Sequence, residues 1–189
     1  SQTVIAVLIG LMLFPERASA VLIDALDTTR EWKVQGIEFF GNQAFSADEF
    51  SEAMSTKARA WYRVWEDRPP FDPITFQNDL EKLRRFYESK GYYETTIAYE
   101  LVVDEPNTWI TARINIGEPP PVLISEVNVE VKGDSSAQAV LPKELPLKPG
   151  AIFREAEYQQ AEQFLRTIFL DHGYAYAKTE RKAQVNVDD

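Results

Sequence analysis

The sequence predicts an α+β fold made of two tandem modules, each with two helices packed on one face of a three-stranded sheet. The first observation is an internal repeat, because residues 71–94 recur 82 positions later as residues 153–176. Both copies place apolar side chains at the helical period, and the segments around them alternate apolar and polar residues as strands do. These patterns give each module the order strand, helix, helix, strand, strand, with the second module truncated.

The first twenty residues have the composition of a secretory signal peptide. An apolar run at residues 4–14 is followed by Pro15, a charged pair and then the small residues Ala18, Ser19 and Ala20. This order predicts export with cleavage after Ala20, which leaves residues 21–31 as a short lead-in. The alternative is that the run is retained as a membrane anchor, although a continuous span needs about 20 apolar residues.

The first module is expected to cover residues 32–117. Residues 32–40 are rich in strand-forming residues, and Gly36 marks a bulge within that strand. Ser46 and Glu49 form a capping box, which predicts a helix from Ala47 to about Lys57. Residues 59–70 break the periodicity and end in two prolines, so this segment is expected to be a loop.

The repeated segment supplies the main helix of the module, and a hairpin follows it. Asp72 can cap the helix and Gly91 supplies the left-handed residue that ends it. Residues 95–103 and 110–116 alternate apolar and polar side chains, with turn residues at 104–108 between them. Two antiparallel strands are therefore expected.

A proline-rich linker at residues 118–123 leads to the second module at residues 124–189. Consecutive prolines favour extended geometry, so the two modules are expected to keep a preferred angle. The expected elements are a strand at 124–131, a helical stretch near 137–145, the repeated helix and a strand around 183–187. The sequence stops where the second hairpin should turn, so we expect a fragment of a longer protein in which the second module lacks its third strand.

Composition excludes several classes of function. The formal charge of −10 repels phosphate backbones, which makes nucleic acid an unfavourable partner. The absence of cysteine excludes disulfides and thiolate zinc sites. The single histidine, His172, lies at the end of a helix, and the acidic residues Asp48, Glu49 and Glu52 lie in the first turns of another, where the helix dipole favours each charge. No catalytic constellation, metal site or cofactor site is predicted, and the protein is not expected to be an enzyme.

Two features are candidate partner-binding surfaces. The strand at 95–103 is expected at the open edge of the sheet, where it can pair with an extended chain through its backbone, and its outward side chains are Thr96, Ala98, Glu100 and Val102. The loop at 59–70 carries the aromatic residues Trp61, Tyr62 and Trp65, which are of the kind that anchor interfaces. The alternatives are an edge covered by a neighbouring domain and a small satellite core under the loop.

The sequence combines a strand that ends at Gly41 or Gly133, a helix that ends in Gly-Tyr, and a hairpin that closes with Gly117 and Pro119. This tandem pattern resembles the POTRA domains of the outer-membrane protein assembly family, which includes BamA and TamA, and is most similar to those of TamA. The loop at 59–70 is longer than its counterpart in the second module, which leaves open whether the chain belongs with BamA, TamA or the two-partner secretion transporters.

This resemblance implies a periplasmic arm attached to a C-terminal barrel in the outer membrane, with no catalytic residues. Its partners would be unfolded or extended polypeptide clients and other envelope assembly subunits, and it would guide outer-membrane or secreted proteins by strand addition. A second hypothesis is a single-pass inner-membrane envelope scaffold, of the divisome or secretion type, with a POTRA-like periplasmic part. The sequence of the mature N-terminus distinguishes the two hypotheses.

Overall fold

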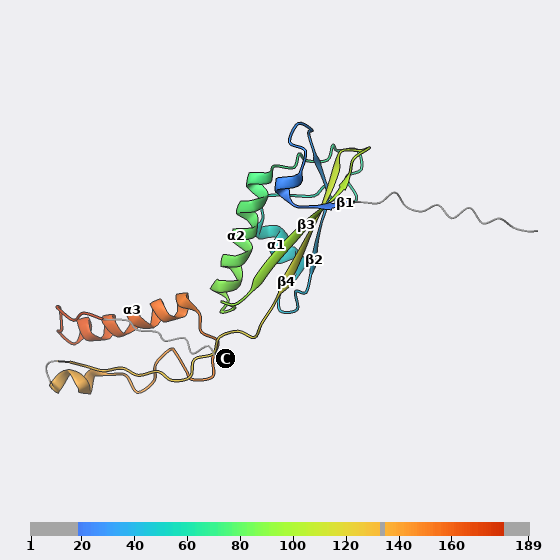
Figure 1. Ribbon diagram of the computed structural model, residues 1–189. Coiled ribbons are helices and arrows are strands. Elements are labelled where there is room, and N and C mark those ends of the chain that lie inside the picture. The colour runs from blue at the N-terminus through green and yellow to red at the C-terminus, as the bar shows by residue number, and fades with distance from the viewer. Residues whose placement is uncertain (1–18, 133–134, 180–189) are drawn as a thin grey trace, which may run out of the picture.

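The computed structural model describes residues 19–132 and 135–179 (Figure 1). The apolar run at 4–14 and the strand expected around 183–187 lie outside these residues. The first module contains β1 (Ser19–Val21), the 3-10 helix η1 (Ile23–Ala25), β2 (Lys33–Phe40), α1 (Ala47–Ala53), α2 (Pro73–Ser89), β3 (Thr96–Asp104) and β4 (Trp109–Gly117). The second contains the 3-10 helix η2 (Ser135–Val140) and α3 (Glu155–Asp171).

The predicted α+β class is confirmed, but the sheet of the first module has four strands instead of three. Its order is β1-β3-β4-β2, in which β2 runs parallel to β4 and both other pairs are antiparallel. The additional strand is β1, which comes from residues assigned to the signal peptide and the lead-in. Three residues are too few to show an alternating pattern, so periodicity could not reveal this strand.

The predicted hairpin is present, with β3 and β4 paired from Thr96 opposite Gly117 to Asp104 opposite Trp109. The turn is closed by the Asp104 side chain, which accepts a hydrogen bond from the Asn107 side chain at 2.8 Å. The register between β2 and β4 shifts between Val34 and Gly36, as the predicted bulge requires.

The capping predictions hold for both helices of the first module. Ser46 and Glu49 form the capping box of α1, and Asp72 caps α2 by accepting from the backbone of Thr75 at 3.0 Å. However, α1 ends at Ala53 and does not reach Lys57, because Met54 adopts an extended conformation. The next two backbone N–H groups then donate to a side chain of α2 instead of to helix carbonyls.

The core of the first module lies between α2 and one face of the sheet. Phe50 of α1 and Phe76, Leu83 and Tyr87 of α2 are fully buried. They meet the inward side chains of the sheet, among which Val34, Leu101, Ile110, Ala112 and Ile114 are almost completely buried. Aromatic packing is extensive, as in the ring contact of 5.6 Å between Phe50 and Tyr87.

The second module is less regular than the sequence predicts. α3 is present and its end carries Gly173 at a φ of +91°. Residues 124–131 form no strand, and the helical stretch expected near 137–145 is present in part, as the 3-10 helix η2 that ends at Val140. In the first module β2 is held by β4, and residues 124–131 have no such neighbouring strand among the described residues. At their start, an isolated bridge joins Leu123 to Ile152, and Ile124 donates to the carbonyl of Ala151 and accepts from the N–H of Gly150.

Backbone hydrogen bonds tie the linker to both modules. Val122 donates to the carbonyl of Gly91 at the end of α2 and accepts from the N–H of Phe153 at the start of the second module, at 2.9 and 2.8 Å. Glu118 accepts from the backbone of Gln43 at 2.5 Å and thereby holds the turn between β2 and α1. Hydrogen bonds to the first module and to the start of the second therefore hold the linker between them.

Candidate functional site

The outer edge of β3 is only partly covered in the four-stranded sheet. β1 pairs with it over three positions, Ser19 opposite Val103, Ala20 opposite Val102 and Val21 opposite Leu101. The expectation that the whole of residues 95–103 forms an open edge is therefore wrong for its last three residues, because the N-terminal segment covers them. Residues 96–100 have no strand beside them on this side among the described residues.

The predicted outward residues lie on the solvent face of β3. Thr96 and Ala98 are exposed on the uncovered part, whereas Val102 is half-buried and lies opposite Ala20. Ile97 and Tyr99 point to the other face, where Tyr99 packs edge-on against Phe76 with their ring centroids 5.4 Å apart. The uncovered part of the edge thus offers backbone groups and the small exposed side chains of Thr96 and Ala98.

Glu100 belongs to a row of charges that crosses the solvent face of three strands. Arg113 of β4 lies 3.4 Å from Glu100 of β3 and 3.0 Å from Glu38 of β2. The hydrogen bonds from Arg113 to Glu38 and to Glu100 raise the pKa of the guanidinium above its ordinary value. Glu100 is therefore already paired within the sheet, which leaves Thr96 and Ala98 as the unengaged outward side chains of the predicted set.

The opposite edge of the sheet is closed at its start by the end of the aromatic loop. Val34 donates to the carbonyl of Pro69, and Phe71 donates to the carbonyl of Trp32, both at 2.8 Å. The sequence pattern identified the two prolines as the end of a loop, but not their pairing with β2. Among the described residues, none pairs with the outer side of the later part of β2.

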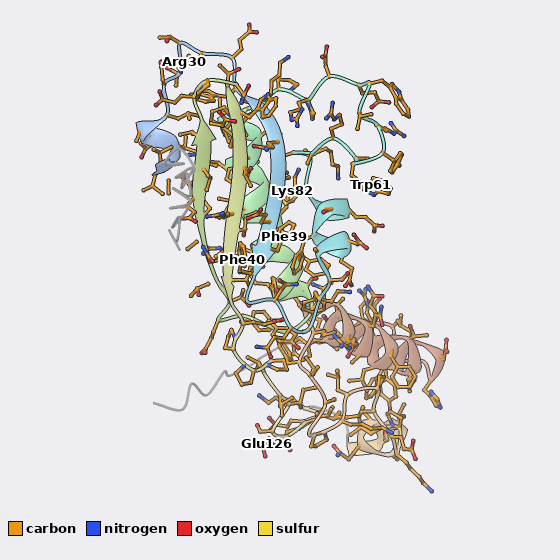
Figure 2. The ribbon with its side chains drawn as sticks, turned by 90° about the vertical axis from the view of Figure 1, so that its right-hand side faces the viewer. Arg30, Phe39, Phe40, Trp61, Lys82 and Glu126 are labelled. Atoms are coloured by element: carbon orange, nitrogen blue, oxygen red, sulfur yellow. The ribbon has the colours of Figure 1, made fainter. Side chains whose placement is uncertain are left out.

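The aromatic side chains of the loop at 59–70 do not form a satellite core. Trp61, Tyr62 and Trp65 are all exposed, and Trp61 stands away from the sheet beyond α1 (Figure 2). Trp61 and Tyr62 contact each other edge to edge, with ring centroids 5.8 Å apart, and the guanidinium of Arg63 lies 5.8 Å from the ring centroid of Tyr62. The structure therefore favours the interface role of this trio over the core role.

A cavity of about 720 Å³ lies in the second module between α3 and the segment 127–132. Its helical lining includes Tyr158, Leu165 and Phe169. With the repeat offset of 82, these residues correspond to Phe76, Leu83 and Tyr87, the buried residues of α2. The cavity therefore occupies the position of a module core and is not a candidate ligand site.

Titratable groups do not assemble into a chemical centre in the described part of the chain. No group of three histidine or acidic side chains there is placed to hold a metal ion. His172 caps the end of α3, and its Nδ1 lies 2.8 Å from the carbonyl oxygen of Ile168, as expected for a residue at a helix end. Within the same residues, no helix combines the length and the apolar character needed to cross a bilayer.

Comparison with known proteins finds one family model and several related proteins that match this chain. The model of the POTRA family, described as "Surface antigen variable number repeat", matches residues 32–118 and 123–189. The outer membrane protein assembly factor BamA of Neisseria meningitidis serogroup B is 28% identical over 156 residues, which are 81% of this chain and 19% of that protein. BamA of Buchnera aphidicola subsp. Acyrthosiphon pisum is 26% identical over 113 residues, covering 57% of this chain and 18% of that protein.

Among solved structures, the crystal structure of POTRA domains 3–5 of Haemophilus influenzae BamA aligns with a TM-score of 0.46 and 18% identity. The alignment covers 86% of this chain and 59% of that one. The chain spans about a fifth of the length of the curated relatives it matches. Both of these relatives are BamA proteins, so the particular similarity to TamA stays a prediction.

Proposed function

The chain belongs to the POTRA family, and from this premise we propose that it is a periplasmic polypeptide-binding arm of an outer-membrane assembly or translocation factor. In this role it guides unfolded outer-membrane or secreted proteins by strand addition at the free edge of β3. Its partners are extended polypeptide clients and other subunits of the assembly machinery. The similar proteins named above are assembly factors of the outer membrane.

The observation that carries this proposal is the pairing of β1 with β3. A three-residue extended segment from a distant part of the chain is added there in antiparallel register. Its residues are Ser19, Ala20 and Val21, none of which has a large side chain. Since strand addition uses backbone hydrogen bonds that every extended chain can make, the same edge suits clients of mixed sequence.

The length of the uncovered edge sets the size of the client segment. Residues 96–100 extend over about 17 Å at about 3.4 Å per residue, which matches a short strand. The exposed side chains of Thr96 and Ala98 are small, so they exclude few partner sequences. Selectivity would then come from the extended conformation of the client and not from its side chains.

The experiment that tests the proposal measures binding of an extended peptide of alternating valine and threonine residues. The same peptide N-methylated at alternate positions, in both phases, serves as the probe for backbone pairing. Strand addition predicts that one phase loses binding and the other retains it, because only alternate N–H groups face the edge. Equal binding of all three peptides would contradict strand addition.

A proline variant locates the binding edge. Ala98→Pro removes a backbone N–H from the uncovered part of β3, and a loss of peptide binding in a folded variant is the expected result. If this variant fails to fold, the methylated peptides still decide the question. If the folded variant binds as well as the parent protein, clients bind elsewhere on the module.

A further inference from the structure

The loop between α1 and α2 presents an unusual concentration of exposed apolar side chains. The exposed fractions are 87% for Trp61, 55% for Tyr62, 68% for Val64 and 77% for Trp65. These four residues fall within a stretch of five and come from a segment without a helix or strand. Exposing two tryptophans to water is unfavourable unless a partner covers them.

Internal hydrogen bonds hold the loop in this outward conformation. The guanidinium of Arg59 donates through Nη1 to the carbonyls of Val64 and Glu66, at 3.1 and 2.6 Å. The base of the loop is fixed by Arg68, whose guanidinium carbon lies 3.9 Å from the ring centroid of Trp109. These contacts hold the loop in a defined conformation in which its aromatic side chains point into solvent.

The charge of the loop differs from that of the chain. Residues 57–68 contain four basic residues, Lys57, Arg59, Arg63 and Arg68, against two acidic ones. The complete sequence contains 20 basic and 30 acidic residues. The exposed aromatic residues therefore lie in a locally positive segment of a strongly acidic protein, and charge complementarity favours an anionic partner.

We propose that residues 57–68 bind the headgroup region of a lipid bilayer that contains anionic phospholipid. Tryptophan and tyrosine rings partition into this region because one part of each ring is apolar and another is polar. Arginine is suited to phosphate oxygens through paired hydrogen bonds. The side chains project from the surface, and the cavity described above lies in the other module, so a flat and deformable partner fits them better than a small ligand.

Vesicle binding tests this proposal with the complete chain. Flotation with vesicles of phosphatidylcholine alone and of phosphatidylcholine mixed with phosphatidylglycerol gives the partition of the protein at low and at physiological ionic strength. We expect binding to the mixed vesicles, weaker binding to the neutral ones, and a loss of affinity as salt is added. Tryptophan emission should also shift to shorter wavelength on the mixed vesicles, since Trp61 and Trp65 are the most exposed of the four tryptophans.

Variants assign the binding to the loop. The double variant Trp61→Ala with Trp65→Ala should lower the partition by about tenfold or more, because it removes most of the area that enters the bilayer. Arg63→Gln should weaken binding to the mixed vesicles only. Tyr176→Ala is the matched control, since this side chain is 97% exposed but belongs to the second module.

Retention of vesicle binding by the double variant would overturn the proposal, as would equal loss in the tyrosine control. Failure of the parent chain to bind either kind of vesicle would also overturn it and would leave a protein as the partner of the loop. An unchanged melting temperature in the double variant shows that any loss of binding is not a loss of fold. Vesicle binding by the loop and peptide binding at the β3 edge are measured separately, so failure of one proposal does not affect the other.

Discussion

The carboxylate of Asp79 accepts a hydrogen bond from the backbone N–H of Thr56 at 2.6 Å, although the two residues belong to different segments of the first module. The same carboxylate accepts from the backbone of Ser55 at 2.8 Å and from Nζ of Lys82 at 2.8 Å. Asp79 lies on α2 and is completely buried. It therefore joins the segment after α1 to α2 and gives hydrogen-bond partners to two backbone N–H groups of that segment.

Replacing Asp79 by asparagine should destabilise the first module by about 1–3 kcal/mol, because an uncharged group then faces donors in a buried site. Urea unfolding of the parent and the variant gives this difference. Glu81→Gln is the control on the same helix, since Glu81 is exposed and its only ion pair in the described residues is a contact of 3.9 Å with Arg84. An equal effect of both substitutions would contradict the role given to Asp79.

The stability of the first module should depend on pH through the carboxylate of Asp79. Burial alone would raise the pKa of Asp79, but the hydrogen bonds from Lys82, Ser55 and Thr56 outweigh it and hold the pKa below its ordinary value of 3.8. Because the folded pKa is the lower one, the stabilisation is present above pH 3.8 and is lost as the pH falls through the folded value. Unfolding measured from pH 6 downward, through about pH 4 to pH 2, should show the parent and Asp79→Asn converge at the acid end.

Gly91 and Gly173 end the two repeated helices with the same left-handed backbone, yet they should respond differently to alanine. Their φ angles are +94° and +91°, so each substitution should cost about 1–2 kcal/mol through backbone strain. A Cβ at Gly91 would also overlap Ile152 Cγ2 and lie 2.7 Å from the carbonyl oxygen of Phe153, whereas one at Gly173 meets none of the described residues within 4 Å. Thermal unfolding should therefore show a larger loss for Gly91→Ala, and solution scattering should show that only this variant loosens the junction between the modules.

Periodicity placed Leu80 and Leu83 on the same helical face, but the structure separates their contributions. Leu83 is fully buried, whereas Leu80 is only half-buried at the margin of the core. Leu83→Ala should cost about 2–5 kcal/mol and Leu80→Ala about 1–2 kcal/mol. Chemical unfolding of both variants measures the difference, and similar losses would mean that the helix is rotated relative to the sheet.

Local patterns predicted the elements that are stabilised by local interactions. The capping box at Ser46, the cap at Asp72 and the hairpin strands were correct because each depends on residues close in sequence. The end of α1 was not predictable in this way. Its stop depends on Asp79, which is 23 residues from Thr56 and whose buried position no periodicity indicates.

The sequence predicted the part of the candidate site that depends on local alternation, but not the part that depends on distant segments of the chain. Alternation correctly gave the faces of β3, so Thr96 and Ala98 were placed on the solvent side. The cover on its final residues comes from Ser19, Ala20 and Val21, which carry no strand pattern and pair across a long sequence separation. Exposure of Trp61 and Trp65 also could not be read from the sequence, since the same aromatic residues would suit a buried cluster.

The predicted cleavage after Ala20 gives a final test, because it would divide β1. The product would keep Val21 but lose Ser19 and Ala20, which pair with Val103 and Val102. The lead-in should stay attached after the cut, since Ile23 and Leu26 are buried in the core. The uncovered positions of β3 would then be residues 96–100 together with Val102 and Val103, because only Ser19 and Ala20 are lost.

Hydrogen exchange can compare the chain that begins at Ser1 with one that begins at Val21. We expect faster exchange of amides in residues 102 and 103 in the shorter chain, because the residues that pair with them are lost, and tighter binding of an extended peptide to the less covered edge. Amides of Ala112 and Ile114 in β4 serve as the internal control, since that strand lies between β3 and β2 in both forms. Identical exchange in residues 102 and 103 would show that Ser19 and Ala20 contribute nothing to the protection of this edge. N-terminal sequencing of the protein isolated from cells would establish which of the two forms the cell produces.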